Sequence, residues 1–254
     1  MRRGALLVLV IAALAGCGGG SSGSDKGVPN LTVSAAASLK GAFTAYASQF
    51  RQASVRFSFA GSDMLAAQIE QGIKPDVFAS ANTKLPEALY AKGLVSKPVV
   101  FAANKLVIAV PASSSKVRSI ADLDKRGVTI AIGSATVPIG TYTREVLGRL
   151  GATSKKILAN VRSEEPDVSG IVGKLTEGAV DAGFAYVTDV KATHGSLKAI
   201  PLPASLQPVV AYAAAVVNGA PHPALARTFI DGLLHGVGRS ALLYAGFLPP
   251  PRTP

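Results

Sequence analysis

The chain has 254 residues, of which 48% are hydrophobic and 16% are charged, with 26 lysine and arginine residues against 15 aspartate and glutamate residues. This apolar content excludes a disordered tail or an acidic scaffold, because such chains have too little apolar surface to bury, and the length suits one or two domains. The formal net charge of +11 is not gathered into basic runs with interleaved aromatic residues, so we expect no nucleic-acid partner.

The first 16 residues have the pattern of a signal peptide. Arg2 and Arg3 form a short positive region, and the 13 residues from Gly4 to Gly16 are almost wholly apolar. A run of this length is too short to span a bilayer as a helix, but it suits the apolar region of a signal peptide. We therefore expect residues 1–16 to be removed and the rest of the chain to be extracytoplasmic.

The only cysteine, Cys17, directly follows a Leu-Ala-Gly sequence. This arrangement resembles the bacterial lipobox, in which the cysteine is lipidated and becomes the first residue of the mature chain. It predicts a lipoprotein anchored to the cell membrane at Cys17. Residues 17–30 are rich in glycine and serine and predict a flexible linker. The alternative, an ordinary secretory signal that ends near a buried thiol, does not explain that run.

Strands and helices are predicted to alternate through the rest of the chain. Short β-prone runs are followed by segments whose apolar residues recur every three to four positions. The predicted strands lie at 31–36, 55–59, 76–79, 106–110, 128–132, 182–186 and 209–217. The predicted helices lie at 38–50, 62–69, 86–92, 139–150, 168–176, 224–234 and 240–244. This alternation predicts an α/β fold with largely parallel sheets.

Small residues begin three of these helices directly after strands. Ser38 follows the first predicted strand, Ser62 follows the second, and the segment 137–140 follows the strand that ends at Ile132. In open α/β sheets ligands bind at the carboxyl ends of strands, where helix N-termini present free N–H groups and roughly half a positive charge each. Plain N-capping is the alternative role for each serine. Convergence of the three positions on one cleft would favour an anionic ligand.

The sequence contains no recognisable catalytic or metal-binding motif. The three histidines lack metal-ligand spacing, and no nucleophile elbow, Walker sequence or dinucleotide-binding glycine motif occurs. The paired carboxylates Glu164–Glu165 and Asp122/Asp124 lie in polar, loop-like sequence, where we expect them to be solvated. We therefore expect no enzymatic activity, no cofactor and no metal held directly by side chains.

Several sequence blocks occur between residues 31 and 248 in an order that identifies a family. They include TVSAAASL at 32–39, FSFAGS at 57–62, PDVFASA at 75–81, VPIGTY at 137–142 and GFAYVTD at 183–189. A single block would be weak support, but the combination of A-A-A-S-L, A-G-S and D-V-F-A-S-A is specific. Together the blocks resemble the molybdate-binding proteins of bacterial ABC importers.

The resemblance implies a two-lobed periplasmic-binding-protein fold of type II, with a hinge and a ligand cleft between the lobes. We expect the first lobe to comprise 31–105 and 214–254, and the second to comprise 106–213. Two connections are expected to cross between the lobes, near 104–106 and again near 209–214. Closure of the hinge would bury a tetrahedral oxyanion in the cleft.

The resemblance also implies five ligand-binding residues. In the first lobe, Ser38 and Ser62 would each offer a hydroxyl and a backbone N–H. In the second, Ile139 and Val168 would each offer a backbone N–H, and Tyr186 would offer its phenol. Molybdate at neutral pH carries no proton and only accepts hydrogen bonds, so a site made of donors suits it. Phosphate retains a proton that requires an acceptor.

Two residues depart from the family pattern. Asp63 stands where members often have a second serine or threonine, and its place in the first turn of a helix predicts that it faces away from the ligand and complements the helix dipole. Ile139 is larger than the residue common at its place in the V-P-x-G turn, although only its N–H is needed.

The resemblance further implies a transport role. The expected partners are molybdate, with tungstate as a second ligand, an inner-membrane ABC permease and its ATPase, and the membrane through the lipid anchor. The chain is expected to be a monomer. Two alternatives stay open: a receptor for sulfate or phosphate, and a surface interaction lipoprotein that kept the fold but lost the ligand.

Overall fold

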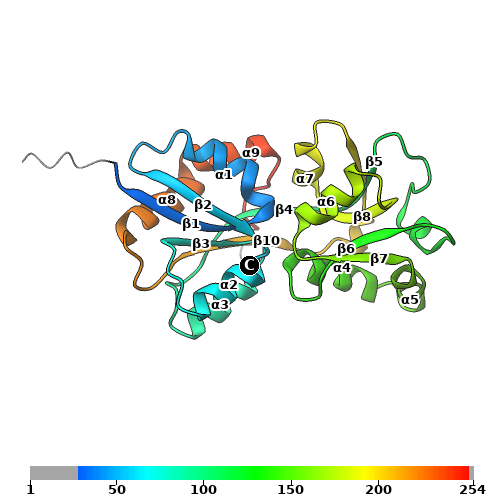
Figure 1. Ribbon diagram of the computed structural model, residues 1–254, viewed down its shortest axis with the longest axis horizontal. Helices are drawn as coiled ribbons and strands as arrows, with labels where there is room; N and C mark the ends of the chain where they lie inside the picture. The colour runs from blue at the N-terminus through cyan, green and yellow to red at the C-terminus, as the bar shows by residue number, and fades with distance from the viewer. Residues whose placement is uncertain (1–27, 252–254) are drawn as a thin grey trace, which may run out of the picture.

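The computed structural model describes residues 28–251, which form two lobes side by side (Figure 1). The predicted signal peptide, the predicted lipidation of Cys17 and most of the predicted linker lie outside the described residues and stay predictions. None of the helices within the described range is long and apolar enough to span a membrane.

In the described part of the chain, five strands form the sheet of the first lobe. In spatial order they are β2 (Ser54–Ala60), β1 (Asn30–Ala36), β3 (Val77–Ser80), β10 (Val210–Val216) and β4 (Val99–Asn104). β1 runs parallel to β2 and to β3, whereas β10 runs antiparallel to β3 and to β4.

The sheet of the second lobe repeats this pattern within residues 28–251. Its strands, in spatial order, are β7 (Val161–Glu165), β6 (Ile130–Gly133), β8 (Ala182–Tyr186), β5 (Leu106–Pro111) and β9 (Leu197–Pro201). β6 is parallel to β7 and β8, and β5 is antiparallel to β8 and β9. Within these residues, four strands of each sheet run in one direction, so the predicted largely parallel arrangement holds except for β10 in the first lobe and β5 in the second. β5 and β10 each follow a crossing from the other lobe, and each runs against the strands beside it.

Helices pack against both sheets. The first lobe carries η1 (Ala37–Leu39), α1 (Lys40–Ala47), α2 (Ser62–Glu70), α3 (Lys84–Ala91), α8 (Pro223–His235) and α9 (Val237–Ala245). The second lobe carries η2 (Ile120–Asp124), α4 (Pro138–Gly148), α5 (Ala152–Ala159), α6 (Val168–Thr176), α7 (Val187–Ala192) and η3 (Ala204–Leu206). In Figure 1, α1, α8 and α9 lie on one side of the first sheet and α2 and α3 lie on the other.

The extent to which each strand is buried explains which strands could be predicted from the sequence. Every residue of β3, β8 and β10 is buried, because these strands lie inside their sheets with helices over them, and they read as continuous apolar runs. The edge strand β7 alternates between exposed and partly buried residues. It was missed, and Glu164–Glu165 lie in this strand rather than in a loop. β4, β9, α5 and α7 were also missed.

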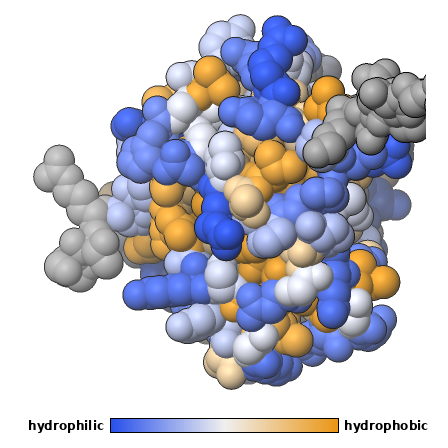
Figure 2. Space-filling view, turned by 90° about the vertical axis from the view of Figure 1, so that its left-hand side faces the viewer, coloured by the Kyte–Doolittle hydropathy of each residue, from blue (hydrophilic) through white to orange (hydrophobic). Residues whose placement is uncertain are grey.

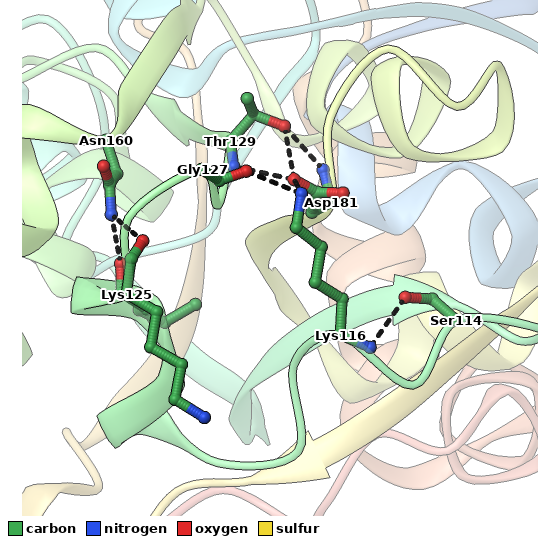
Figure 3. A network of polar contacts seen from close by, with 8 residues as sticks. Ser114, Lys116, Lys125, Gly127, Thr129, Asn160 and Asp181 are labelled. Atoms are coloured by element: carbon green, nitrogen blue, oxygen red, sulfur yellow. Dashed lines mark hydrogen bonds and ion pairs between the residues drawn. The ribbon is translucent and has the colours of Figure 1, made fainter.

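The same threonine–aspartate pair joins two parallel strands in each lobe. The fully buried Asp76 carboxylate accepts hydrogen bonds from the backbone N–H and hydroxyl of Thr32, at 2.7 and 2.8 Å. In the second lobe Asp181 accepts from the N–H and hydroxyl of Thr129, both at 2.8 Å, and from the Lys116 ammonium at 2.6 Å (Figure 3). Both pairs lie at the amino ends of the parallel strands, which leaves the carboxyl ends free for a ligand.

The second crossing between the lobes lies before β10. Val210 pairs with Asn104 of β4 and Ala213 pairs with Ser80 of β3, so residues 210–213 belong to the first sheet, although the sequence assigned them to the second lobe. The run 209–217 is uniformly apolar and contains no local boundary signal. The Gln207 side chain joins the two crossings, because its amide accepts from the Leu106 N–H and donates to the Leu106 carbonyl, both at 3.1 Å.

The outer end of the first lobe has a mixed surface. Figure 2 shows hydrophobic and hydrophilic residues interspersed over this face, which is the side of the first lobe at which β1 begins. The described residues on this face are therefore a mixture of polar and apolar types. The large contiguous cluster of apolar residues is buried in the cores of the lobes.

Candidate functional site

A small cavity lies between the lobes at the carboxyl ends of β1, β2, β6 and β8. All five residues that the sequence assigned to ligand binding line it: Ser38, Ser62, Ile139, Val168 and Tyr186. The cavity volume is about 20 Å³. Pockets for organic ligands are typically of roughly 300–1,000 Å³, so this cavity suits a small inorganic ion.

Four helix starts point at this cavity, two from each lobe. Ser38 lies in η1, which runs directly into α1, and Ser62 is the first residue of α2. Ile139 is the second residue of α4, after Pro138 at its first position, and Val168 is the first residue of α6. Helix starts carry N–H groups without partners inside the helix and a partial positive charge, although at α6 Asp167 already accepts from the Ser169 and Gly170 N–H groups. The four starts together attract an anion without a basic side chain.

The start of α4 is held tightly against the end of β6. A Cβ on Gly140 would overlap the Ser134 carbonyl oxygen, so only glycine allows this approach. The Arg144 guanidinium donates to the Gly133 carbonyl at 2.7 Å and forms an ion pair with Glu164 at 2.9 Å. These contacts fix the backbone around Ile139, which lines the cavity.

Each of the two serine hydroxyls has a hydrogen-bond partner within the first lobe. The Ser62 side chain is 1% exposed, and its oxygen accepts a hydrogen bond from the Ala81 N–H at 3.1 Å. The Ser38 oxygen lies 2.9 Å from the Tyr212 phenol oxygen. With the phenol as donor, each serine oxygen is already an acceptor, and its own hydrogen remains free to be donated into the cavity.

Tyr186 brings a buried phenol to the cavity without a hydrogen-bond partner among the described residues. The residue is 1% exposed. Leaving such a group unpaired costs about 1–3 kcal/mol, so a ligand atom that accepts its hydrogen would relieve a real penalty. Burial raises the pKa of Tyr186 well above its usual range, so the phenol remains a donor.

The cavity is otherwise nearly free of formal charge. Lysine, arginine and histidine are absent from the described residues that line it. Among the described residues of the lining the one carboxylate is Asp167, which caps α6 by accepting from the Ser169 N–H at 2.7 Å and from the Gly170 N–H at 3.3 Å. Within residues 28–251 no group of three or more histidine, cysteine, aspartate or glutamate residues could hold a metal ion. The lining therefore supplies donors together with one carboxylate among its described residues, Asp167, whose Oδ1 is engaged in capping α6.

Comparison with known proteins agrees with this geometry. The family model for bacterial extracellular solute-binding proteins matches residues 31–248. The chain belongs to this family. It is 35% identical to the molybdate-binding protein ModA of Mycobacterium tuberculosis over 258 residues, which cover 97% of each chain. The resemblance found in the sequence motifs is confirmed.

Solved structures show the same fold. The substrate-binding domain of a putative molybdenum ABC transporter from Clostridium difficile has a TM-score of 0.66 at 28% identity, covering 87% of this chain and 98% of that chain. The periplasmic molybdate-binding protein of Azotobacter vinelandii has a TM-score of 0.77 at 24% identity, covering 87% and 100%. The predicted two-lobed periplasmic-binding fold is confirmed for this solute-binding protein.

A titratable carboxyl lies behind the cavity of the solute-binding protein. Asp189 accepts a hydrogen bond from the Tyr186 backbone N–H at 3.1 Å. Burial, with a contribution from the negative charge of Asp167, raises the pKa of Asp189 from its ordinary value of 3.8 to about 7. Because the folded state holds this proton more tightly than the unfolded state, the stability contributed by Asp189 is full below about pH 4 and is lost as the pH rises through about 7.

Asp189→Asn is therefore expected to remove part of the pH dependence of stability. The amide still accepts from the Tyr186 N–H but cannot ionise, so the melting temperature of the variant minus that of wild type should increase from about pH 5 to about pH 8. Thermal melts of the two ligand-free proteins across this range measure the difference. Glu177→Gln, at an exposed carboxylate, is the matched control and should show a constant difference. A constant difference for Asp189→Asn would contradict the prediction.

The sequence missed several residues around the site. Tyr212, which holds Ser38, lies within the apolar run of β10 and has no local signal. Ala81 and Gly61 line the cavity and were not singled out as ligand-binding residues. Asp63 does not line the cavity, in keeping with its expected orientation, but its hydrogen bond to Thr136 across the cleft was not foreseen.

Proposed function

We propose that this protein is an extracytoplasmic receptor that captures molybdate, and tungstate, and delivers the anion to an ABC permease. The observation that carries the proposal is the set of donor groups from both lobes around one small cavity, with the unpaired Tyr186 phenol among them. Relatives that match most of the chain bear the name of molybdate-binding proteins, which supports the same ligand.

The proposed site binds the anion by hydrogen bonds alone. The hydroxyl and N–H groups of Ser38 and Ser62, the N–H groups of Ile139 and Val168, and the Tyr186 phenol make about seven donors, nearly two for each molybdate oxygen. Molybdate has no proton to donate, so it leaves no group unpaired in such a site. Monohydrogen phosphate needs an acceptor for its proton, and the one carboxylate among the described residues of the lining, Asp167, is engaged through Oδ1 in capping α6, which disfavours phosphate. No catalytic step and no cofactor are part of this role.

Delivery requires partners outside the chain. We propose an inner-membrane permease with its ATPase as the partner, reached by a monomer held at the cell membrane through lipidated Cys17. A relative in Clostridium difficile is described as the substrate-binding domain of a putative molybdenum ABC transporter, which supports this arrangement. Closure of the lobes around the anion would report occupancy to the permease.

A thermal-shift titration tests the ligand. Molybdate and tungstate are expected to raise the melting temperature, because a ligand at 100 times its Kd stabilises the folded state by about 2.7 kcal/mol. Sulfate, phosphate and sodium chloride of matched ionic strength are the comparison arms. A shift of the melting temperature with sulfate or phosphate but not with molybdate would show that the receptor binds that anion instead of molybdate. No shift with any of these oxyanions would refute the receptor function.

A further inference from the structure

A hydrogen bond crosses the cleft beside the cavity. The Thr136 hydroxyl, from the loop before α4 in the second lobe, donates to Asp63 Oδ2 in the first turn of α2 at 2.6 Å. The two residues are 73 positions apart and belong to different lobes. Because one partner lies in each lobe, this bond exists only while the lobes are together.

The lobes are in direct contact at the same place. A Cβ on Gly61 would overlap the Pro166 carbonyl oxygen and would lie 3.3 Å from the Val137 Cγ1 atom, and both of these belong to the second lobe. The Asp63–Thr136 bond therefore sits at the closed edge of the cleft, next to the donors of the cavity but outside its lining.

We propose that Asp63 and Thr136 form a latch that stabilises the closed cleft, so that Asp63 strengthens anion binding without touching the anion. This inference rests on the proposed function, since it requires a ligand whose capture is completed by closure. A hydrogen bond between a hydroxyl and a carboxylate is charge-assisted, and 2.6 Å is within the short range of such bonds. Asp63 is thus a positioning residue for binding.

The sign of the effect separates the latch from a simple charge effect. A carboxylate near a bound dianion repels it, so loss of Asp63 would tighten binding if charge alone mattered. Loss of the latch instead weakens binding, because the closed state loses a bond that the open state never had. The two readings predict opposite changes for the same substitution.

Four variants test the latch by isothermal titration with molybdate and by the rate of molybdate release. Asp63→Ala and Thr136→Val are each expected to weaken binding by about 2- to 12-fold and to accelerate release. Asp63→Asn keeps an acceptor oxygen and, like Asp63→Ala, carries no charge, so it should bind more tightly than Asp63→Ala. The double variant Asp63→Ala/Thr136→Val should bind no more weakly than the weaker single variant, because both remove the same bond.

Matched controls and a shape measurement complete the test. Glu70→Ala removes a negative charge from the same helix, where Glu70 pairs with Lys92 inside the first lobe, and it should leave affinity unchanged. Small-angle scattering of the molybdate-bound proteins should show a larger open fraction for Asp63→Ala than for Glu70→Ala, while the ligand-free melting temperatures of both stay close to wild type.

The outcomes separate the latch from the proposed function. If wild type binds molybdate and Asp63→Ala binds equally or more tightly, the latch is overturned and the receptor function stands. If the effects of Asp63→Ala and Thr136→Val add in full in the double variant, the two residues act independently and the latch is also overturned. If wild type binds none of the four oxyanions, the receptor function fails, and the latch fails with it.

Discussion

Replacing Tyr186 by phenylalanine is expected to weaken molybdate binding by about 10- to 150-fold while leaving the ligand-free protein at least as stable as wild type. The affinity loss corresponds to a hydrogen bond to a charged group, worth about 1.5–3 kcal/mol. The ligand-free protein loses nothing, because the phenol is buried and has no partner among the described residues. Isothermal titration and thermal melts of the same preparations measure both quantities.

Weaker molybdate binding together with equal or higher ligand-free stability would identify the Tyr186 phenol as a group whose hydrogen bond is made to the ligand. Tyr244→Phe is the matched control, because Tyr244 is 87% exposed, and the same loss of a hydroxyl there should change neither affinity nor stability. A fall of several degrees in the melting temperature of ligand-free Tyr186→Phe would show that the phenol serves the fold. Unchanged affinity would remove Tyr186 from the site.

The second large effect is expected from Gly61→Ala, which should hinder closure of the lobes and so weaken molybdate binding by about 5- to 150-fold. The added methyl group would overlap the Pro166 carbonyl oxygen of the other lobe, and overpacking of this kind costs about 1–3 kcal/mol. The backbone of Gly61 has a φ of −57°, which alanine adopts without strain. Within its own lobe the added Cβ would come nearest to Asp63 Oδ1, at 2.8 Å, and this end of a flexible side chain can move, so the open protein should fold normally. The expected result is therefore loss of affinity with an unchanged ligand-free melting temperature.

A second glycine provides the control for Gly61→Ala. Gly173 lies inside α6, and a Cβ there would meet no atom of the described residues within 4 Å. Gly173→Ala should leave affinity unchanged and raise stability by about 0.5–1 kcal/mol, the usual gain from this substitution within a helix. Small-angle scattering with molybdate should show that Gly61→Ala stays more open than Gly173→Ala. Full closure of Gly61→Ala with wild-type affinity would contradict the steric argument.

Much of the site could be predicted because its residues have local signals. Ser38 and Ser62 directly follow apolar strands and begin helical patterns, and Pro138 places the start of α4 after β6. Val168 and Tyr186 came only from the family resemblance. Valine contributes a backbone N–H that no side-chain pattern reveals, and a tyrosine at the end of an apolar strand is equally typical of a core.

The parts of the fold that escaped prediction also have a physical explanation. β7 is an edge strand whose residues Arg162 and Glu164 face solvent, so its composition matches that of a loop. The lobe boundary was misplaced because β10 is apolar throughout, and a strand that is buried in one lobe reads the same as one buried in the other. Asp122 and Asp124, expected in a polar loop, lie in the short helix η2, where Asp122 bonds Ser119 and pairs with Lys125.

The sequence by itself determined the local chemistry: which residues begin helices, that the predicted ligand groups are donors without basic side chains, and which family the chain belongs to. The tertiary structure decided the contacts between residues that are far apart in the sequence. The Ser38–Tyr212 contact joins residues 174 positions apart, and Asp63 meets Thr136 across the cleft. The isolation of the Tyr186 phenol and the fit of Gly61 against Pro166 likewise depend on how the lobes pack. Local propensity acts over a few residues, whereas these contacts depend on the position of one lobe against the other, which no short segment encodes.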